Sequence, residues 1–367
     1  VASRAGRGSS RRGDDSLLPY PREGDTSRVA AISQGLKWLA SRQSSRDGSL
    51  EVGDAEPGQR APLAVTSLAA LAWMSGGSTL TRGEHQSNVR SAVEYLLAST
   101  HRAADEFPGY IEDRGDNISR THGHGLATLA LAQAYTVSPN TPLGKRIGET
   151  LLLAIERIVG SQGSEGGWYY SAARSIQHEG SVTVAMVQAM RAANDVGIRV
   201  DPAAVKEAVE YVTRLQVMEL SDEPDPAEDD QVAARKRARQ TLGGFKYGLD
   251  DPQTSIALTA AGLVTLQASG TYDGPRVDEG YDFIWRKLLE REEDGWWRGH
   301  AQLASEDGTR GYTAELLARL ELADGAYDLT GRAQGYEGRT EVAERLATHL
   351  CSRLAKYARR GSMFRLV

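Results

Sequence analysis

The sequence Gln162-Gly-Ser-Glu-Gly-Gly-Trp-Tyr-Tyr170 decides the fold, because the chain repeats its plan several times. An amphipathic segment ends in a glutamine, a short polar or glycine-rich turn follows with a glycine and an aromatic residue, and a segment rich in Ala, Leu and Thr comes next. The same order recurs around Gln43 and from Gln216 to Tyr247, and without the glutamine at 107–110 and 294–297. Repetition of this kind predicts one continuous body built from similar units.

Two kinds of predicted helix alternate along the chain. One kind is amphipathic, and the other is apolar nearly all round and rich in small residues. The amphipathic segments are 31–42, 88–98, 147–159, 203–215 and 277–290, and the apolar segments are 63–74, 123–135, 181–193 and 254–268. A helix without a polar face has to be enclosed on both sides. The alternation therefore predicts an all-α fold, an α/α toroid of about five helix pairs with the amphipathic helices outside.

Local signals predict how the helices start and how they are joined. Asp201-Pro202 and Asp251-Pro252 each place a capping carboxylate before a proline, the pattern of a helix start. We therefore expect Asp251 to open the helix over 254–268. The Gly-aromatic turns are predicted to join each outer helix to the next inner one, with the glutamine bonding to backbone groups of the turn.

Three segments differ from the repeats in composition. Residues 1–28 are rich in Arg, Ser, Gly and Asp without apolar periodicity, which predicts a disordered leader before a toroid domain over 29–367. Residues 219–240 form an acidic run followed by a basic one, and they interrupt a repeat, so we expect a surface insertion. Residues 300–367 keep helical patterns but lack the aromatic turn, and they are predicted to form a divergent last repeat.

Composition bounds the partners and cofactors. The net charge of -6 leaves no basic stripe for nucleic acid, and no apolar run approaches the roughly 20 residues of a membrane-spanning helix. Cys351 is the only cysteine, so an internal disulfide and a Cys-rich zinc site are excluded, and we expect neither a metal nor another cofactor. This composition is compatible with a soluble cytoplasmic protein. The chain begins at Val1 and not at Met, so a targeting segment removed before it is one alternative, and the compartment stays open.

The glutamine-containing Gly-Gly-Trp and Gly-Gly-Phe turns, together with the alternating helices, resemble the repeats of the terpenoid cyclase and protein prenyltransferase superfamily. Within it, they are most similar to the prenyltransferase and squalene-oxidase repeat proteins. The resemblance covers roughly residues 29–300. It implies an α/α toroid with a central apolar cavity, which in the enzymes holds an isoprenoid chain.

The resemblance also shows where a catalytic acid would lie. Squalene-hopene-type cyclases protonate an alkene with an Asp-x-Asp-Asp motif placed before an inner helix, and this chain has no such motif. At the corresponding places it has Glu179 before one inner helix, and Asp250 and Asp251 before the next. These three are the candidate catalytic acids, since an acid in a dry cavity stays protonated. The structural alternatives are a helix cap for Asp251 and a solvated turn residue for Glu179.

A second set of residues is predicted to line the ligand cavity. The sequence Thr121-His-Gly-His-Gly125 opens an inner helix, and its His122 and His124 could share a metal in an extended turn or line the cavity, of which we favour the lining. The aromatic residues of the turns complete the set, with a purely structural core as their alternative. These residues are Trp168, Tyr170, Phe245, Tyr247 and Trp296.

Three classes of function follow. The favoured one is a non-catalytic toroid that binds an apolar, isoprenoid-like ligand or a protein partner. The second is a squalene-hopene-type cyclase with a degenerate acid motif. The third is a glycan-active α/α barrel, which would use paired carboxylates and aromatic platforms such as Trp296 and Tyr170. A protein prenyltransferase is excluded, because its Asp, Cys and His zinc ligands are missing.

Overall fold

The structure is a computed structural model that describes residues 26–50, 60–116, 120–219 and 241–293. The fold of these residues is all-α, with nine helices and a single two-stranded ladder. Its first helix begins at Thr26, inside the segment predicted to be a leader. Almost all of the predicted insertion, the whole of the predicted last repeat and Trp296 lie outside the described residues.

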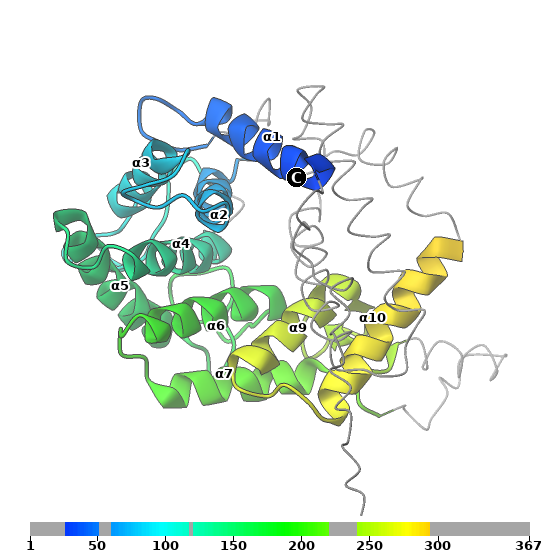
Figure 1. Cartoon of the computed structure of the whole chain (residues 1–367). Helices are drawn as coiled ribbons and strands as arrows, with labels where there is room; N and C mark the ends of the chain where they lie inside the picture. Colours follow the sequence, from blue (N-terminus) through cyan, green and yellow to red (C-terminus); the bar gives the residue numbers. More distant parts are fainter. Residues whose placement is uncertain (1–25, 51–59, 117–119, 220–240, 294–367) are drawn as a thin grey trace, which may run out of the picture.

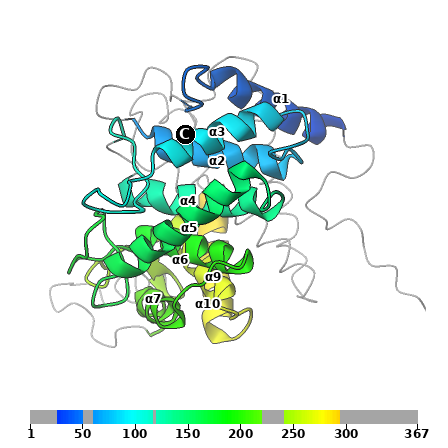
Figure 2. The ribbon, with the colours of Figure 1, turned by 90° about the vertical axis from the view of Figure 1, so that its left-hand side faces the viewer.

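The helices form two layers that curve together through an arc (Figure 1). The inner helices pack side by side in chain order, and the outer helices cover them, as Figure 2 shows from the outer side. The inner helices are α2 (Pro62–Ser75), α4 (Arg120–Thr136), α6 (Gly180–Asp195) and α9 (Ile256–Ala268). The outer helices are α1 (Thr26–Arg42), α3 (Gln86–Ala98), α5 (Pro142–Ser161), α7 (Pro202–Leu215) and α10 (Pro275–Glu293). The predicted alternation of inner and outer helices is confirmed for these residues.

The inner helices approach one another through small residues. At Gly125 in α4, an added Cβ would lie 3.0 Å from the backbone and side chain of Ala185 in α6. Most of the surrounding positions in both helices are buried alanine, threonine or valine. Close packing of this kind explains why α4 and α6 carry small residues where they meet.

One hydrogen bond recurs at the start of every described inner helix and aligns the repeats. The backbone N–H of the buried residue in the turn donates to a side chain one turn inside the helix that follows. The bonds are Leu50 to Thr66 Oγ1, Ile111 to His124 Nδ1, Trp168 to Thr183 Oγ1 and Phe245 to Thr259 Oγ1, over 2.8 to 3.1 Å. His124 therefore takes the place that threonine holds in the other repeats, and its role there is structural.

The glutamine at the end of an outer helix ties the turn to the next outer helix. Gln162 Nε2 donates to the carbonyl of Gly166 at 2.9 Å and to that of Ala204, in α7, at 2.8 Å. Gln43 and Gln216 make the same two bonds in their own repeats. The predicted hydrogen bond of the glutamine to its turn is confirmed. Its second hydrogen bond, to the next outer helix, was not predicted.

Two of the inner helices, α2 and α6, also donate hydrogen bonds from their first turns to the repeat that follows. The backbone N–H of Gly180, at the start of α6, donates to the carbonyl of Tyr247 in the next turn at 2.8 Å. Leu63 N, at the start of α2, donates to Asp116 Oδ2 in the same way at 3.1 Å. The first turn of a helix has backbone N–H groups without intrahelical partners, and the following repeat supplies acceptors for them.

The predicted helix start at Asp251-Pro252 is wrong. Helix α9 begins at Ile256, and Ser255 Oγ caps it by accepting from Leu258 N. The reason is that β2 (Thr254–Ser255) pairs antiparallel with β1 (Phe245–Lys246), which keeps the chain extended there. Asp251 instead caps a tight turn by accepting from Gln253 N. The corresponding prediction for Asp201 is confirmed, since it caps α7 through Ala203 N.

Candidate functional site

The hydrogen bond from each turn to the following inner helix defines equivalent positions on the four inner helices. Two sets of these equivalent positions form one partly exposed face. We count positions in each inner helix from the side chain that accepts this hydrogen bond. The residues two positions after it are Leu68, Leu126, Ala185 and Ala261. Five residues after it stand Leu71, Leu129, Gln188 and Val264. All eight are partly buried and keep some contact with solvent, whereas the residues around them are mostly buried. The outer helices cover the outer side of the arc (Figure 1), and we infer from this that the apolar face lies on its inner, concave side. We call it the concave face.

A polar pair stands at one end of the concave face. Two residues before the bonded side chain, the four repeats carry Ala64, His122, Ser181 and Ala257. His122 Nε2 lies 2.7 Å from Ser181 Oγ, so the pair joins α4 to α6 at the amino-terminal ends of both helices. The sequence analysis identified His122 as a site residue but not Ser181. The only feature of the sequence that could have identified Ser181 is its position in the repeat, which is equivalent to that of His122.

Glu179 lies directly behind this pair. It caps α6, accepting from Ser181 N at 3.0 Å, from Val182 N at 2.7 Å and from Ser181 Oγ at 2.7 Å. Its side chain is 0 % exposed, so the alternative of a solvated turn residue is wrong. Burial raises the pKa of Glu179, and hydrogen bonds from Ser181, Val182 and the Tyr170 hydroxyl act against that rise.

The bonds determine which nitrogen of His122 carries the proton. Burial lowers the pKa of His122 to about 4, so its ring is neutral at pH 7. The Ser181 hydroxyl donates its one proton to Glu179, and its oxygen therefore accepts from His122 Nε2–H. In this tautomer Nδ1 carries a lone pair, for which the described residues provide no hydrogen-bond donor.

Two tyrosines complete this polar cluster, which comprises His122, Tyr170, Glu179, Ser181 and Tyr247. The rings of His122 and Tyr170 lie with their centroids 5.5 Å apart, and the hydroxyls of Tyr170 and Tyr247 share a short hydrogen bond. Burial raises the pKa of both tyrosines, so both are neutral at pH 7. The structure thus brings together four residues that the sequence singled out separately.

The other predicted site residues lie elsewhere. Trp168 and Phe245 are buried in the turns, and His124 is buried in the first part of α4, where it accepts from Ile111 N. Asp250 is exposed and Asp251 caps its turn, away from the polar cluster's hydrogen bonds. Trp296 lies outside the described residues.

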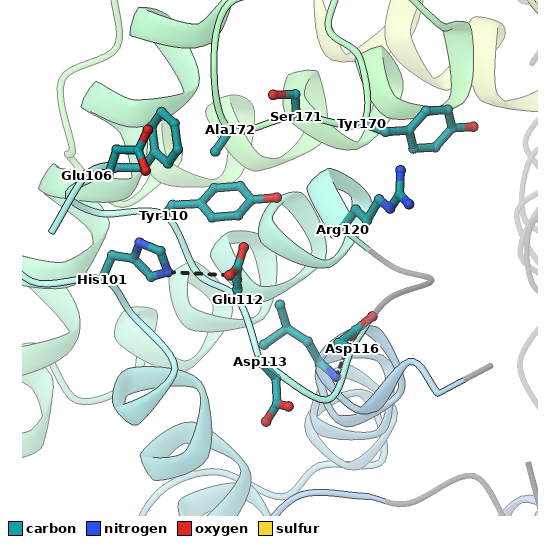
Figure 3. Close-up of a pocket in the computed structure, with 12 residues that line it drawn as sticks. His101, Glu106, Tyr110, Glu112, Asp113, Asp116, Arg120, Tyr170, Ser171 and Ala172 are labelled. Atoms are coloured by element: carbon teal, nitrogen blue, oxygen red, sulfur yellow. Dashed lines mark hydrogen bonds and ion pairs between the residues drawn. The ribbon is translucent and has the colours of Figure 1, made fainter. Parts of the chain in front are cut away.

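An acidic cleft of about 410 Å³ opens beside the polar cluster and shares Tyr170 with it (Figure 3). Its carboxylates include Glu112, 3.7 Å from His101 Nε2, and Asp113, which accepts from the Tyr95 hydroxyl. Asp116, also in the cleft, caps α2. A glycan-active enzyme needs two carboxylates free to act on its substrate. Here Asp113 and Asp116 hold structural bonds, whereas Glu106 and Glu112 also line the cleft, so the glycan-active alternative stays a prediction.

Neither a metal site nor a membrane span is found among the described residues. They contain no group of three or more His, Cys, Asp or Glu side chains arranged to hold a metal ion. None of the described helices combines the length and the apolar composition needed to cross a bilayer. The chain matches no protein-family model and none of the curated proteins with which it was compared.

Replacing His124 with threonine is expected to remove part of the acid sensitivity of the fold. Burial lowers the pKa of His124 to about 3, helped by the charges of Arg157 and His101, whereas its ordinary pKa is 6.5. Between these values the unfolded chain binds a proton that the folded protein does not, so stability falls as pH drops below 6.5. The dependence of the unfolding free energy on pH should lessen by about 1.4 kcal/mol per pH unit in the variant.

Urea unfolding between pH 7 and pH 4 measures this difference. Threonine is the natural residue at the equivalent positions 66, 183 and 259, so the variant keeps an acceptor for Ile111 N. The smaller side chain is expected to lower stability equally at every pH. A slope identical to that of the wild type would contradict the buried, neutral state of His124.

Proposed function

We propose that the protein binds one long apolar, isoprenoid-like molecule along its concave face without transforming it. The observation that carries this proposal is the alignment of seven apolar residues and Gln188 in two rows across four inner helices. Contiguous apolar patches that remain accessible on a protein often mark binding sites. The clustering of polar groups at one end is typical of small-molecule sites, where a few such groups fix the ligand's orientation.

The proposal includes a closed ring. The described helix pairs curve through an arc, and each inner helix packs against the next (Figure 1). We infer that further helices complete an α/α toroid of the kind seen in the terpenoid cyclase superfamily. Its closure would turn the concave face into the wall of a central cavity.

Replacing Leu129 with glutamine is expected to weaken binding of squalene by about tenfold, because a buried leucine contact contributes about 1.5 kcal/mol or more. Glutamine occupies the equivalent position 188 in the next repeat, so the fold accommodates it. Leu152 is 50 % exposed on outer helix α5, and its replacement by glutamine is the matched control. The experiment is native mass spectrometry of lipid-extracted protein after incubation with squalene.

The outcomes separate a lipid ligand from a protein partner. Squalene retained by the wild type and the Leu152 variant, and lost from the Leu129 variant, would support the proposal. Equal loss in both variants would place the ligand elsewhere. No retention by any of them would exclude an apolar small molecule and leave an apolar protein segment as the alternative occupant.

Protonation of an alkene by Glu179 is the second candidate function. It is favoured by the burial of this carboxyl group and its raised pKa beside the concave face. Against it, two backbone N–H groups and the Ser181 hydroxyl donate to the carboxylate, and such bonds stabilise its charged form. Cyclised products after incubation with squalene, absent from a Glu179→Gln variant, would establish the enzyme.

A further inference from the structure

We propose that the ligand of the concave face carries a single uncharged hydroxyl group, which donates its hydrogen bond to His122 Nδ1. This rests on the proposed function and specifies the chemical class of the ligand as an apolar alcohol. The hydroxyl would lie at the end of the concave face where His122 and Ser181 meet.

The first argument is the hydrogen-bonding capacity of the polar cluster. Ser181 is saturated by Glu179 and His122, and the hydroxyls of Tyr170 and Tyr247 bond to each other. The lone pair on His122 Nδ1 is left without a donor among the described residues. A buried acceptor that loses water without gaining a donor costs free energy. A hydroxyl group supplies that donor, whereas a hydrocarbon or a ketone does not.

The second argument is charge. Among the described residues, no Lys or Arg hydrogen-bonds or pairs with the polar cluster, and the His122 ring is neutral at pH 7. The amino-terminal end of α6 would ordinarily attract an anion, but Glu179 already occupies it and satisfies Ser181 N and Val182 N. Arg120 lines the neighbouring cleft together with Tyr170 but makes no hydrogen bond or ion pair to the polar cluster, so a phosphate or carboxylate head group beside His122 would find no cation bound to the cluster.

Three probes with one carbon skeleton test the head group. Farnesol carries the hydroxyl, farnesyl phosphate carries an anion in its place, and farnesene is the matching hydrocarbon. We expect farnesol to bind the full chain about tenfold more tightly than farnesene, as one added hydrogen bond predicts. Farnesyl phosphate is expected to bind most weakly. Isothermal titration calorimetry measures the three affinities.

A His122→Phe variant keeps the ring and removes the acceptor. We expect this variant to lose the tenfold preference for farnesol over farnesene. The preference of the wild type stands as a test by itself if the variant fails to fold, which a melting curve would reveal. Equal binding of farnesol and farnesene to the wild type would overturn the inference that the ligand carries a hydroxyl group, but not the proposal that it is apolar. Strongest binding of farnesyl phosphate would do the same. No binding of any probe would contradict the proposed function as well.

Discussion

Replacing Gly166 with alanine is expected to lower the free energy of unfolding by about 3 kcal/mol or more. Two costs combine at this position. Gly166 has φ of +91°, a left-handed conformation that costs an L-residue about 1–2 kcal/mol. A Cβ would also lie 2.2 Å from the carbonyl oxygen of Glu207 in α7, so the turn and the next outer helix would have to move apart.

Gly197→Ala is the matched control for this substitution. Gly197 has φ of +88°, but a Cβ there would meet no atom within 4 Å. It should therefore cost only about 1–2 kcal/mol, the cost of the backbone conformation. Urea unfolding of both variants isolates the collision with Glu207. Equal losses would mean that the turn does not press against α7 as described.

Replacing Trp168 with alanine is expected to lower the free energy of unfolding by about 3–5 kcal/mol, the usual cost of deleting a buried aromatic side chain. Trp168 is 1 % exposed, and its indole Nε1 donates to the carbonyl of Ile158 in α5 at 2.8 Å. The side chain thus fills space between layers and also holds the outer helix.

Trp168→Phe separates these two contributions. Phenylalanine keeps most of the apolar contact, as Phe245 does at the equivalent position, but leaves the carbonyl of Ile158 without this donor. We expect a loss of about 1–3 kcal/mol, measured by urea unfolding. A loss from Trp168→Ala as small as that from Trp168→Phe would show that the ring is not a core residue.

The helix alternation could be predicted from the sequence because burial acts on every residue of a segment. An apolar segment without a polar face can only lie inside, and α2, α4, α6 and α9 do so. The start of α9 was mispredicted because local signals compete. Asp251-Pro252 fits a helix start, but pairing of residues 254–255 with 245–246 delays the helix to Ile256.

The candidate site was only partly predictable, because it depends on the register between repeats. The length of each turn varies, so sequence spacing alone does not align His122 with Ser181. The hydrogen bonds from the turn to Thr183 and His124 fix that alignment. They also explain why two histidines separated by one residue have different roles. His124 replaces a structural threonine, and His122 faces the concave side.

The hydrogen bonds that α2 and α6 make with the repeat that follows have a consequence for assembly during translation. Helix α6 leaves the ribosome before Tyr247, whose carbonyl accepts from Gly180 N at its start. The start of α6 therefore lacks one of its hydrogen-bond acceptors until the following turn has been synthesised, and the start of α2 lacks Asp116 in the same way. We expect these two helices to gain stability during translation only when the next turn is complete.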